Sequence, residues 1–419
     1  MDIRKIEKSL KNCPCGREHR CDVRSAEIAP GITSKTGEIL IQNGFPKNIL
    51  LVADENTLKA GQGLEESLAR SGFKVKKLIY KNLRRADMEQ VEEVEGACED
   101  VEGILSVGTG SLNDICRLAA FRQNKEFAVF ATAPSMDGFT SNSAPITKNN
   151  FKFSYPAVQP SVIIADTRIL AAAPAELKSA GFGDMIGKYI GLVDWKIARL
   201  LIDEYYCERV AELSRRAVEK IVAIAPKVTA EDEESAGAVM EALVMTGLCM
   251  GFAQSVRPAS GAEHVVSHFW EVKKLQAGLD SDFHGKKVGV ATVLLNRIYR
   301  EAARIEDIEP REEKTDWQEI QDIYGPGLKE DVMKANTPAT VTQGISPGDL
   351  KKNWGEIRRI INDGLPSDEE LSAMMNAAGA ATKPSEVDVS PELTELGLKY
   401  SAFMRRRLTL LRLRPMLNF

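Results

Sequence analysis

The most informative stretch of the chain is Gly103-Ile-Leu-Ser-Val-Gly-Thr-Gly-Ser-Leu-Asn-Asp114. Its apolar first half predicts a buried strand over 103–107, its next two glycines predict a tight turn, and the residues that follow predict a helix over about 111–121. Glycine lets the backbone turn sharply and approach a ligand without a side chain in the way. The N–H groups and the positive dipole at the start of the helix suit a pyrophosphate. The motif is short, lacks the full G-x-G-x-x-G pattern and is also typical of a plain strand-to-helix turn.

The same alternation of strand and helix continues on both sides of this stretch. The predicted strands are 49–53, 75–80 and 127–131, and helical patterns at 58–68 and 88–98 lie between them. Strands that alternate with helices predict a parallel sheet with helices on both faces. From Thr140 to Asp166 the chain is polar and interrupted by prolines, which predicts a hairpin that returns to the sheet through 162–165. The sequence therefore predicts a Rossmann-like α/β nucleotide-binding domain over 1–170.

Beyond Pro174 the pattern becomes helical. Long amphipathic patterns run over 174–208, 212–226 and 231 to about 257, and a further series occupies the last hundred residues. Two capping boxes are predicted, Ser260 with Glu263 and Ser367 with Glu370, each at the start of a helix. We therefore expect an all-helical domain over 171–419 that binds metal and substrate.

Length and composition limit the class of protein. The chain has 419 residues, of which 43% are hydrophobic and 27% charged, as in ordinary globular proteins of two domains. A net charge of -5 provides no global positive field for nucleic acid. The seven cysteines form no disulfide framework, MDIRKIEKSLKN lacks the apolar core of a secretory signal, and no apolar run approaches about 18 residues. We expect a cytoplasmic protein without a nucleic-acid partner or stable membrane insertion.

Polar residues follow three of the predicted strands. Asp54 comes after the strand at 49–53, the glycine turn after 103–107, and Thr132-Ala-Pro-Ser-Met-Asp-Gly-Phe-Thr-Ser141 after 127–131. Ligands of open α/β sheets lie beyond the carboxyl ends of the strands, so these three ends predict a nucleotide site. Asp137 is a candidate for holding a substrate hydroxyl, and it is equally a candidate for capping the turn at Gly138.

Three of the four histidines lie within 21 positions. His264 and His268 share one helix face, and His284 follows before another helical pattern. A divalent cation needs neutral imidazole or carboxylate ligands, and Asp184 in Gly-Phe-Gly-Asp supplies a carboxylate. The residue types leave either His264 or His268 as the second histidine ligand. They also leave open that the histidines are interior groups and that Asp184 caps a helix.

These motifs, in this order and spacing, resemble the sn-glycerol-1-phosphate dehydrogenases. The resemblance rests on Gly-Thr-Gly-Ser-Leu-Asn-Asp, Thr-Ala-Pro-Ser-Met-Asp-Gly, Gly-Phe-Gly-Asp, Gly-Ala-Glu-His-x-x-x-His and Asp-Phe-His-Gly, and runs from about Asn48 to Thr292. It is closest to the bacterial AraM-like branch. It implies the dehydroquinate synthase-like fold, which the iron-containing alcohol dehydrogenases share.

The resemblance also implies roles for individual residues. It implies that the nicotinamide cofactor, NAD or NADP, contacts Asp54, Gly110, Ser111, Leu112, Asn113, Asp114, Thr132, Ala133, Pro134, Ser135 and Ser141. It implies that Asp137, Asp184 and His268 bind the substrate, that Asp184 and His268 act in catalysis, and that Asp184, His264 and His284 bind the metal. Family members use zinc or nickel, are often homodimers, and reduce dihydroxyacetone phosphate to sn-glycerol 1-phosphate. In that reaction the metal polarises the ketone oxygen.

Other functions of the same fold remain alternatives. A glycerol or other polyol dehydrogenase would use an unphosphorylated substrate. A dehydroquinate synthase-type cyclase would need more basic residues than Lys178 and Lys188 in the central helices, and a non-catalytic relative would not need a complete ligand set. Lys148 is the candidate for binding the substrate phosphate. Asp54 favours NAD over NADP only if it faces the ribose.

Two segments do not fit the resemblance. Cys13, Cys15, His19 and Cys21 place four possible metal ligands in nine residues. They predict either a second, structural zinc or an exposed segment with reduced thiols, because the spacing is tighter than in the usual zinc motifs. The basic, amphipathic segment 405–414 either touches anionic lipid or, as we expect, docks its leucines and leaves its arginines solvated.

Overall fold

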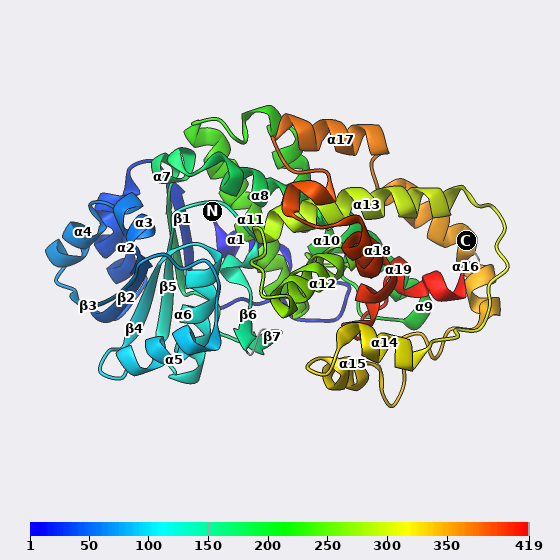
Figure 1. Cartoon of the computed structure of the whole chain (residues 1–419). Coiled ribbons are helices and arrows are strands. Elements are labelled where there is room, and N and C mark those ends of the chain that lie inside the picture. Colours follow the sequence, from blue (N-terminus) through cyan, green and yellow to red (C-terminus); the bar gives the residue numbers. More distant parts are fainter. Residues whose placement is uncertain (149–150, 418–419) are drawn as a thin grey trace.

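The computed structural model describes residues 1–148 and 151–417. A parallel sheet with its covering helices makes up one side of the molecule and a large helical region makes up the other (Figure 1). This architecture confirms the predicted fold class.

Six strands form the sheet, in the order β1-β8-β5-β4-β2-β3, and all neighbours are parallel. The strands are β1 (Ser25–Ala29), β2 (Asn48–Asp54), β3 (Lys74–Tyr80), β4 (Gly103–Gly108), β5 (Glu126–Ala131) and β8 (Val162–Asp166). Central strands such as β4 are buried on both faces, which explains their largely apolar sequence. Edge strand β1 was not predicted, because its five residues are only partly buried and carry no long apolar run.

Helices cover the two faces of the sheet. They are α2 (Thr36–Gln42), α3 (Glu55–Ala60), α4 (Leu64–Arg70), α5 (Met88–Ala97), α6 (Gly110–Arg122) and α7 (Thr167–Ala172). The single helical pattern expected over 58–68 is wrong, because Gly63 adopts a left-handed conformation and separates α3 from α4. The predicted hairpin is confirmed as β6 (Ser143–Lys148) and β7 (Phe151–Pro156).

The second half of the chain is helical, as predicted. Its main helices are α8 (Ala175–Ile186), α9 (Lys188–Ile202), α10 (Glu208–Val222), α11 (Glu233–Ala253), α12 (Ala262–Gln276), α13 (His284–Arg304), α14 (Trp317–Tyr324), α15 (Lys329–Asn336), α16 (Pro347–Gly364), α17 (Asp368–Ala377), α18 (Pro391–Tyr400) and α19 (Leu410–Leu413). The pattern over 174–208 is two helices that meet at Gly187. The capping box of Ser367 with Glu370 is confirmed at α17.

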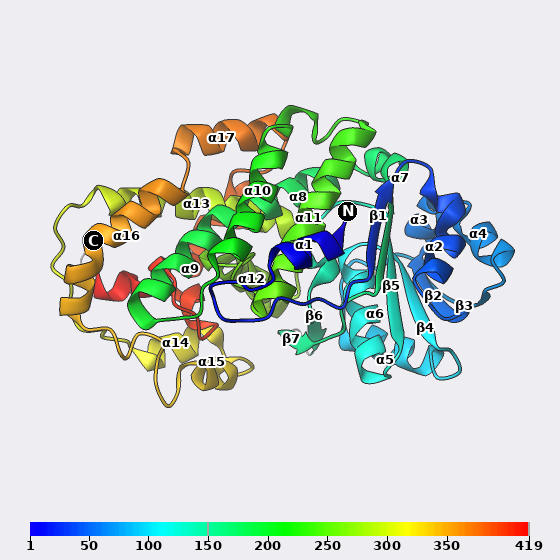
Figure 2. The ribbon, with the colours of Figure 1, turned by 180° about the vertical axis from the view of Figure 1, so that it is seen from behind.

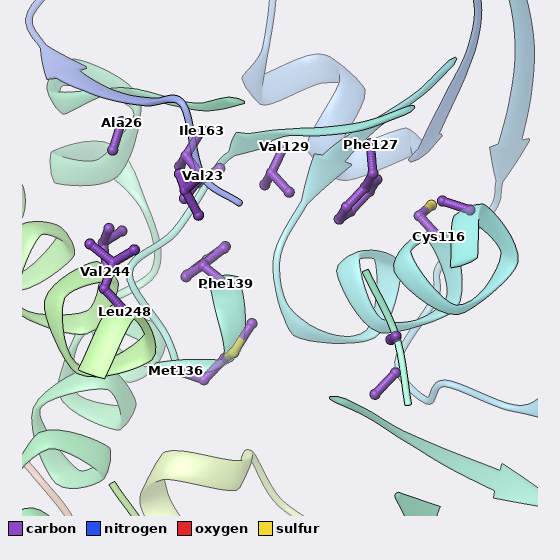
Figure 3. Close-up of a cluster of buried hydrophobic side chains, with 14 of the residues drawn as sticks. Val23, Ala26, Cys116, Phe127, Val129, Met136, Phe139, Ile163, Val244 and Leu248 are labelled. Atoms are coloured by element: carbon purple, nitrogen blue, oxygen red, sulfur yellow. The ribbon is translucent and has the colours of Figure 1, made fainter. Parts of the chain in front are cut away.

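Helix α11 lies at the centre of the molecule. It is long and apolar enough to cross a membrane, but 83% of its apolar window is buried inside the protein. Its side chains Val244 and Leu248 pack in one cluster with Phe139, and with Val129 and Ile163 of the sheet (Figure 3). This shared core fixes the sheet against the helical region.

The first residues of the chain lie against both the helical region and the edge of the sheet, where the Met1 ammonium donates to the Ala26 carbonyl of β1 at 3.1 Å. Figure 2 shows α1 (Ile3–Ser9) and the segment after it running along the helices before the chain enters β1. Arg209 of α10 donates to the Ser9 carbonyl at 3.3 Å, and the ring of His19 lies 2.8 Å from the Phe252 carbonyl of α11. The N-terminal segment therefore connects both parts of the molecule.

The basic C-terminal segment is buried more completely than expected. Its leucines dock on the protein, as predicted. The expectation of solvated arginines is wrong for Arg412, which is 1% exposed and pairs with Glu313 at 2.5 Å. Arg407 donates to the hydroxyl of Ser260 at 2.8 Å, so this arginine also packs against the protein.

Candidate active site

The glycine turn and the loop after β5 meet at the carboxyl edge of the sheet. The amide of Thr132 donates to the Gly108 carbonyl at 3.2 Å. A Cβ at Gly108 would lie 2.4 Å from a Leu112 methyl, so a side chain there would displace Leu112 at the start of α6. Among the described residues, no side chain caps the first turn of α6, so its N–H groups stay open to a phosphate.

Two residues of α6 fit a bound nucleotide. Asn113 is fully buried, and neither polar atom of its side chain has a hydrogen-bond partner among the described residues. Such groups usually have a partner, and a ligand at this turn would provide one. Burial raises the pKa of Asp114 to about 6, and the Arg117 charge opposes this. These residues suit a dinucleotide, although its contacts stay predictions.

Other residues expected at the cofactor already have partners in the protein. The Asp54 carboxylate caps α3 by accepting from the Thr57 amide at 2.8 Å. The Ser111 hydroxyl donates to the Arg84 carbonyl at 3.0 Å. Gly110 and Leu112 lie in the first turn of α6. Five further residues of this set are buried in the loop after β5: Thr132, Ala133, Pro134, Ser135 and Ser141.

Arg117 holds the loop that carries Asp137. Its guanidinium is fully buried and donates to the carbonyls of Gly138, Phe139 and Ser141. Several donors in one planar group fix the path of this loop at little cost in side-chain entropy. The loop in turn directs the Asp137 amide to Asp184 Oδ2 at 2.9 Å.

Three residues from three helices meet beside this loop. Asp184 of α8, His264 of α12 and His284 of α13 each offer a ligand atom, and these atoms lie within 4.8 Å of one another. His264 Nε2 lies 3.5 Å from Asp184 Oδ1, a separation that suits two ligands of one ion. The structure therefore brings together the trio expected at the metal, and the set fits a divalent cation.

Close packing of α8 allows this convergence. A Cβ at Gly285 would lie 2.0 Å from the Ala180 carbonyl oxygen, so α8 and α13 pass each other with no room for a side chain. A Cβ at Gly181 would lie 2.0 Å from the Pro134 carbonyl oxygen, which brings α8 equally close to the loop after β5. Glycine thus positions Asp184 against both His284 and Asp137.

Lys188 joins the two aspartates. Its ammonium lies 2.7 Å from Asp137 Oδ2 and 2.8 Å from Asp184 Oδ1, and both Lys188 and Asp184 are 0% exposed. Although burial opposes it, the Lys188 charge keeps the pKa of Asp184 well below its usual range. Burial and then the charge of Asp184 raise the pKa of Asp137.

Glu263 orients His264. The Glu263 carboxylate lies 2.6 Å from His264 Nδ1 and accepts from the Gly261 amide at 2.8 Å, which leaves Nε2 facing Asp184. The predicted capping box with Ser260 is wrong, because Gly261 is the N-cap of α12 and Glu263 turns to the imidazole. Burial opposes the charge, but hydrogen bonds to Asp184 and Glu263 raise the pKa of His264 to about 9.

His268 and His284 complete a cluster of three imidazoles. The centroid of His268 lies 6.2 Å from that of His264 and 5.4 Å from that of His284. Burial lowers the pKa of His284 to about 3, although Asp184 opposes this. Burial, and then the charge of His284, lower the pKa of His268 well below its usual value. Both rings are therefore neutral at physiological pH, and His268 is partly exposed.

A pair of lysines lies next to the histidines. Lys152 of β7 and Lys287 of α13 contact the two carboxylate oxygens of Glu271, at 2.8 and 3.1 Å. The charges of Lys152 and Glu271 also act on the pKa of His268, which lies one helical turn before Glu271. Lys148, the phosphate candidate from the sequence, is exposed at the end of β6.

Sequence reasoning missed the groups that position the trio. One signal was available for Lys188, because it lies four residues after Asp184 and so on the same helical face. The contacts of Arg117, Glu271 and Lys152 depend on tertiary packing.

A surface cavity of about 500 Å³ lies between α9, α10 and α16. It is lined by other residues, so it is separate from this site.

Known proteins share this fold. A family described as iron-containing alcohol dehydrogenase matches residues 27–174. The solved glycerol dehydrogenase of Schizosaccharomyces pombe aligns with a TM-score of 0.57 at 18% identity, over 88% of this chain and 95% of that chain. The fold is therefore that of the iron-containing alcohol dehydrogenase class.

Curated relatives identify the family within this class to which the chain belongs. The chain is 34% identical to a glycerol-1-phosphate dehydrogenase of Halalkalibacterium halodurans, over 72% of this chain and 77% of that protein. It is 27% identical to the enzyme of the same name from Geobacillus stearothermophilus, over 98% and 96% of the two chains. The chain belongs to the glycerol-1-phosphate dehydrogenase family.

Proposed function

We propose that the protein catalyses the reversible, NAD(P)-linked reduction of dihydroxyacetone phosphate to sn-glycerol 1-phosphate. The observation that carries this proposal is the convergence of Asp184, His264 and His284 next to the glycine turn at the sheet edge. The names of the curated relatives support the substrate and the cofactor.

The trio would hold one divalent ion, zinc or nickel. When bound, the ion supplies a Lewis acid for the ketone oxygen and NAD(P)H supplies the hydride. Lys188 keeps Asp184 ionised and Glu263 keeps His264 in the tautomer that presents Nε2. The ligand set therefore needs little rearrangement to bind the ion.

The remaining polar groups would orient the substrate. Asp137, fixed by its amide contact with Asp184 and by Lys188, would accept a hydrogen bond from a substrate hydroxyl. His268, neutral and partly exposed, would exchange a proton with the alcohol oxygen. We assign the phosphate to Lys152 and Lys287, because these two ammoniums share a single carboxylate, Glu271, and one positive charge is left over.

The lysine assignment makes the substrate testable. Lys152→Met and Lys287→Met are expected to raise KM for dihydroxyacetone phosphate and to leave KM for unphosphorylated dihydroxyacetone unchanged. Lys148→Met is the matched control, since Lys148 is exposed on the same hairpin. A rise in KM only in the Lys148 variant would return the phosphate to that residue.

The function itself is tested on protein stripped with a chelator. Zinc and nickel are restored separately, and dihydroxyacetone phosphate is assayed with NADH and with NADPH. Activity that no divalent ion restores would refute the proposed chemistry. Equal rates with the phosphorylated and unphosphorylated substrates would favour a polyol dehydrogenase, and a reaction without net consumption of NADH would favour a cyclase.

We also propose that the protein is a cytoplasmic homodimer without a nucleic-acid or membrane partner. The net charge of -5 argues against a nucleic-acid partner, and the burial of α11 inside the protein argues against membrane insertion. Light scattering after size-exclusion chromatography tests the oligomeric state.

A further inference from the structure

A second group of side chains that could hold a metal ion lies outside the candidate active site. Cys13, Cys15, His19 and Cys207 each offer a ligand atom, and the four atoms lie within 4.8 Å of one another. Three come from the N-terminal segment, and Cys207 lies at the start of α10, 194 residues after Cys13. The reaction proposed above uses none of these residues.

The separations match one tetrahedral zinc ion. Zinc lies about 2.3 Å from sulfur and about 2.0–2.1 Å from nitrogen, which sets S–S separations of about 3.8 Å and S–N separations of about 3.5 Å. Here the Cys13 and Cys207 sulfurs are 3.5 Å apart. His19 Nε2 lies 3.2 Å from the Cys15 sulfur and 3.6 Å from the Cys207 sulfur. The four atoms thus already surround a space of the right size.

The surrounding contacts prepare the ligands. His19 Nδ1 lies 2.8 Å from the Phe252 carbonyl, so Nδ1 carries the proton and Nε2 is free to bind a metal. Cys13-Pro-Cys-Gly16 forms a tight turn, closed by a 3.1 Å bond from the Gly16 amide to the Cys13 carbonyl. Cys13, His19 and Cys207 are buried, as in structural zinc sites.

Two simpler explanations fit less well. A disulfide needs sulfurs about 2.05 Å apart, and the Cys13 and Cys207 sulfurs are 3.5 Å apart and unbonded. The N-terminal cysteines do not form an exposed segment either, because Cys13 is only 9% exposed. The expectation that Cys21 joins them is wrong, since its sulfur lies 3.7 Å from the carboxylate of Glu7.

We propose that Cys13, Cys15, His19 and Cys207 bind a structural zinc ion that fastens the N-terminal segment to the helical region. Binding releases the three thiol protons to solvent and uses the neutral imidazole. Four protein ligands fill the tetrahedral shell, so this ion has no open position for substrate. The ion links the start of α10 to the segment that leads into edge strand β1 (Figure 2).

The test must separate this ion from any metal at the active site. The double variant Asp184→Asn/His284→Asn, which removes two ligands of the trio, is purified with a thiol reductant and analysed by elemental mass spectrometry. We expect one tightly held zinc per chain. X-ray absorption should show three sulfurs at about 2.3 Å and one nitrogen at about 2.0–2.1 Å.

Variants of the cluster in the same background then assign the ligands. Cys207→Ser is expected to lose the zinc, and Cys21→Ser, the matched control outside the cluster, to retain it. Because Cys207→Ser can fail to fold, a mercurial titration of the thiols in the parent double variant provides a second measurement. Zinc should be released as the cluster cysteines react.

Limited proteolysis reports the structural effect. Arg17 lies between Cys15 and His19 in the sequence, Arg20 directly follows His19, and both arginines are exposed. Release of zinc from the parent double variant should make tryptic cleavage at these sites about tenfold faster, because the segment then opens locally.

The proposal would be overturned by a double variant that holds no zinc, even after reconstitution under reducing conditions. Fewer than three sulfurs around the zinc, or a Cys13–Cys207 disulfide in the reduced preparation, would also overturn it. None of these outcomes depends on enzyme activity, so the proposed catalytic function is tested separately.

Discussion

Replacing Gly285 with alanine tests whether close helix packing builds the active site. The new Cβ would lie 2.0 Å from the Ala180 carbonyl oxygen, whereas ordinary contacts begin at 3.4 Å. The difference is about 1.4 Å, and α8 and α13 must separate by roughly that much. His284 precedes Gly285 directly, and Asp184 lies one turn after Ala180, so both ligands move with the helices.

This shift is large for a metal site. Ligand distances in such sites vary by only about 0.2 Å, and a misplacement of about 1 Å is enough to lower turnover about 10²-fold. Overpacking should also lower the free energy of unfolding by about 1–3 kcal/mol. We therefore expect Gly285→Ala to fold, to bind zinc or nickel much more weakly, and to lose most of its turnover.

The assay combines metal titration of the stripped protein, initial rates at saturating metal, and urea unfolding. Gly355→Ala in α16 is the control, because a Cβ there would meet nothing within 4 Å. That variant should keep its metal affinity and gain about 0.5–1 kcal/mol of stability. A Gly285→Ala protein with the metal affinity and turnover of the parent would refute the idea that this contact positions the trio.

Three further changes probe single groups. His268→Ala should lower kcat by about 10² and leave metal content unchanged, since a proton-transfer group is lost but no ligand; loss of metal on elemental analysis would instead make His268 a ligand. Lys188→Met should lower the free energy of unfolding by about 3–5 kcal/mol in denaturant titrations, because two buried carboxylates lose their counter-ion; an unchanged midpoint would contradict this. Burial, opposed by Glu271, lowers the pKa of Lys287 to about 8. The protonated form is lost as pH rises through that value, so KM for dihydroxyacetone phosphate should rise above about pH 8 in steady-state kinetics. Lys287→Arg, which keeps its charge, should remove this rise, and a rise that persists would assign the titration to another group.

Much of the fold could be predicted because burial leaves a clear record in the sequence. Strand β4 is buried throughout and apolar except at Ser106, Gly108 ends it, and Gly110 begins α6. Strand β1 was missed because an edge strand needs no long apolar run. The break between α3 and α4 was missed because the backbone conformation of Gly63 depends on its surroundings.

The two candidate sites likewise contain residues that could be predicted from the sequence and residues that could not. The residue types of the trio could be predicted, because the chain has only four histidines and the aspartate lies in a recognisable glycine-rich motif. Their positioning groups could not, since the contacts of Arg117 with backbone carbonyls have no sequence signature. Cys207 was missed for the same reason: only the tertiary fold brings it to Cys13, and a search for closely spaced cysteines finds Cys21 instead.

The electrostatics of the trio give a separate reason to expect a cation there. Asp137, Asp184 and Glu263 bring three carboxylates into a buried space, and among the described residues Lys188 is the lysine that pairs with the two aspartates. These carboxylates outnumber Lys188 and leave a surplus of negative charge beside His264, whose hydrogen bonds to Asp184 and Glu263 raise its pKa to about 9 although burial opposes this. A divalent ion that replaces the proton of His264 adds one further positive charge and offsets the surplus. The same carboxylates that orient the ligands thus favour the ion over the proton as pH rises, which ties metal binding to the charge of the site as well as to its geometry.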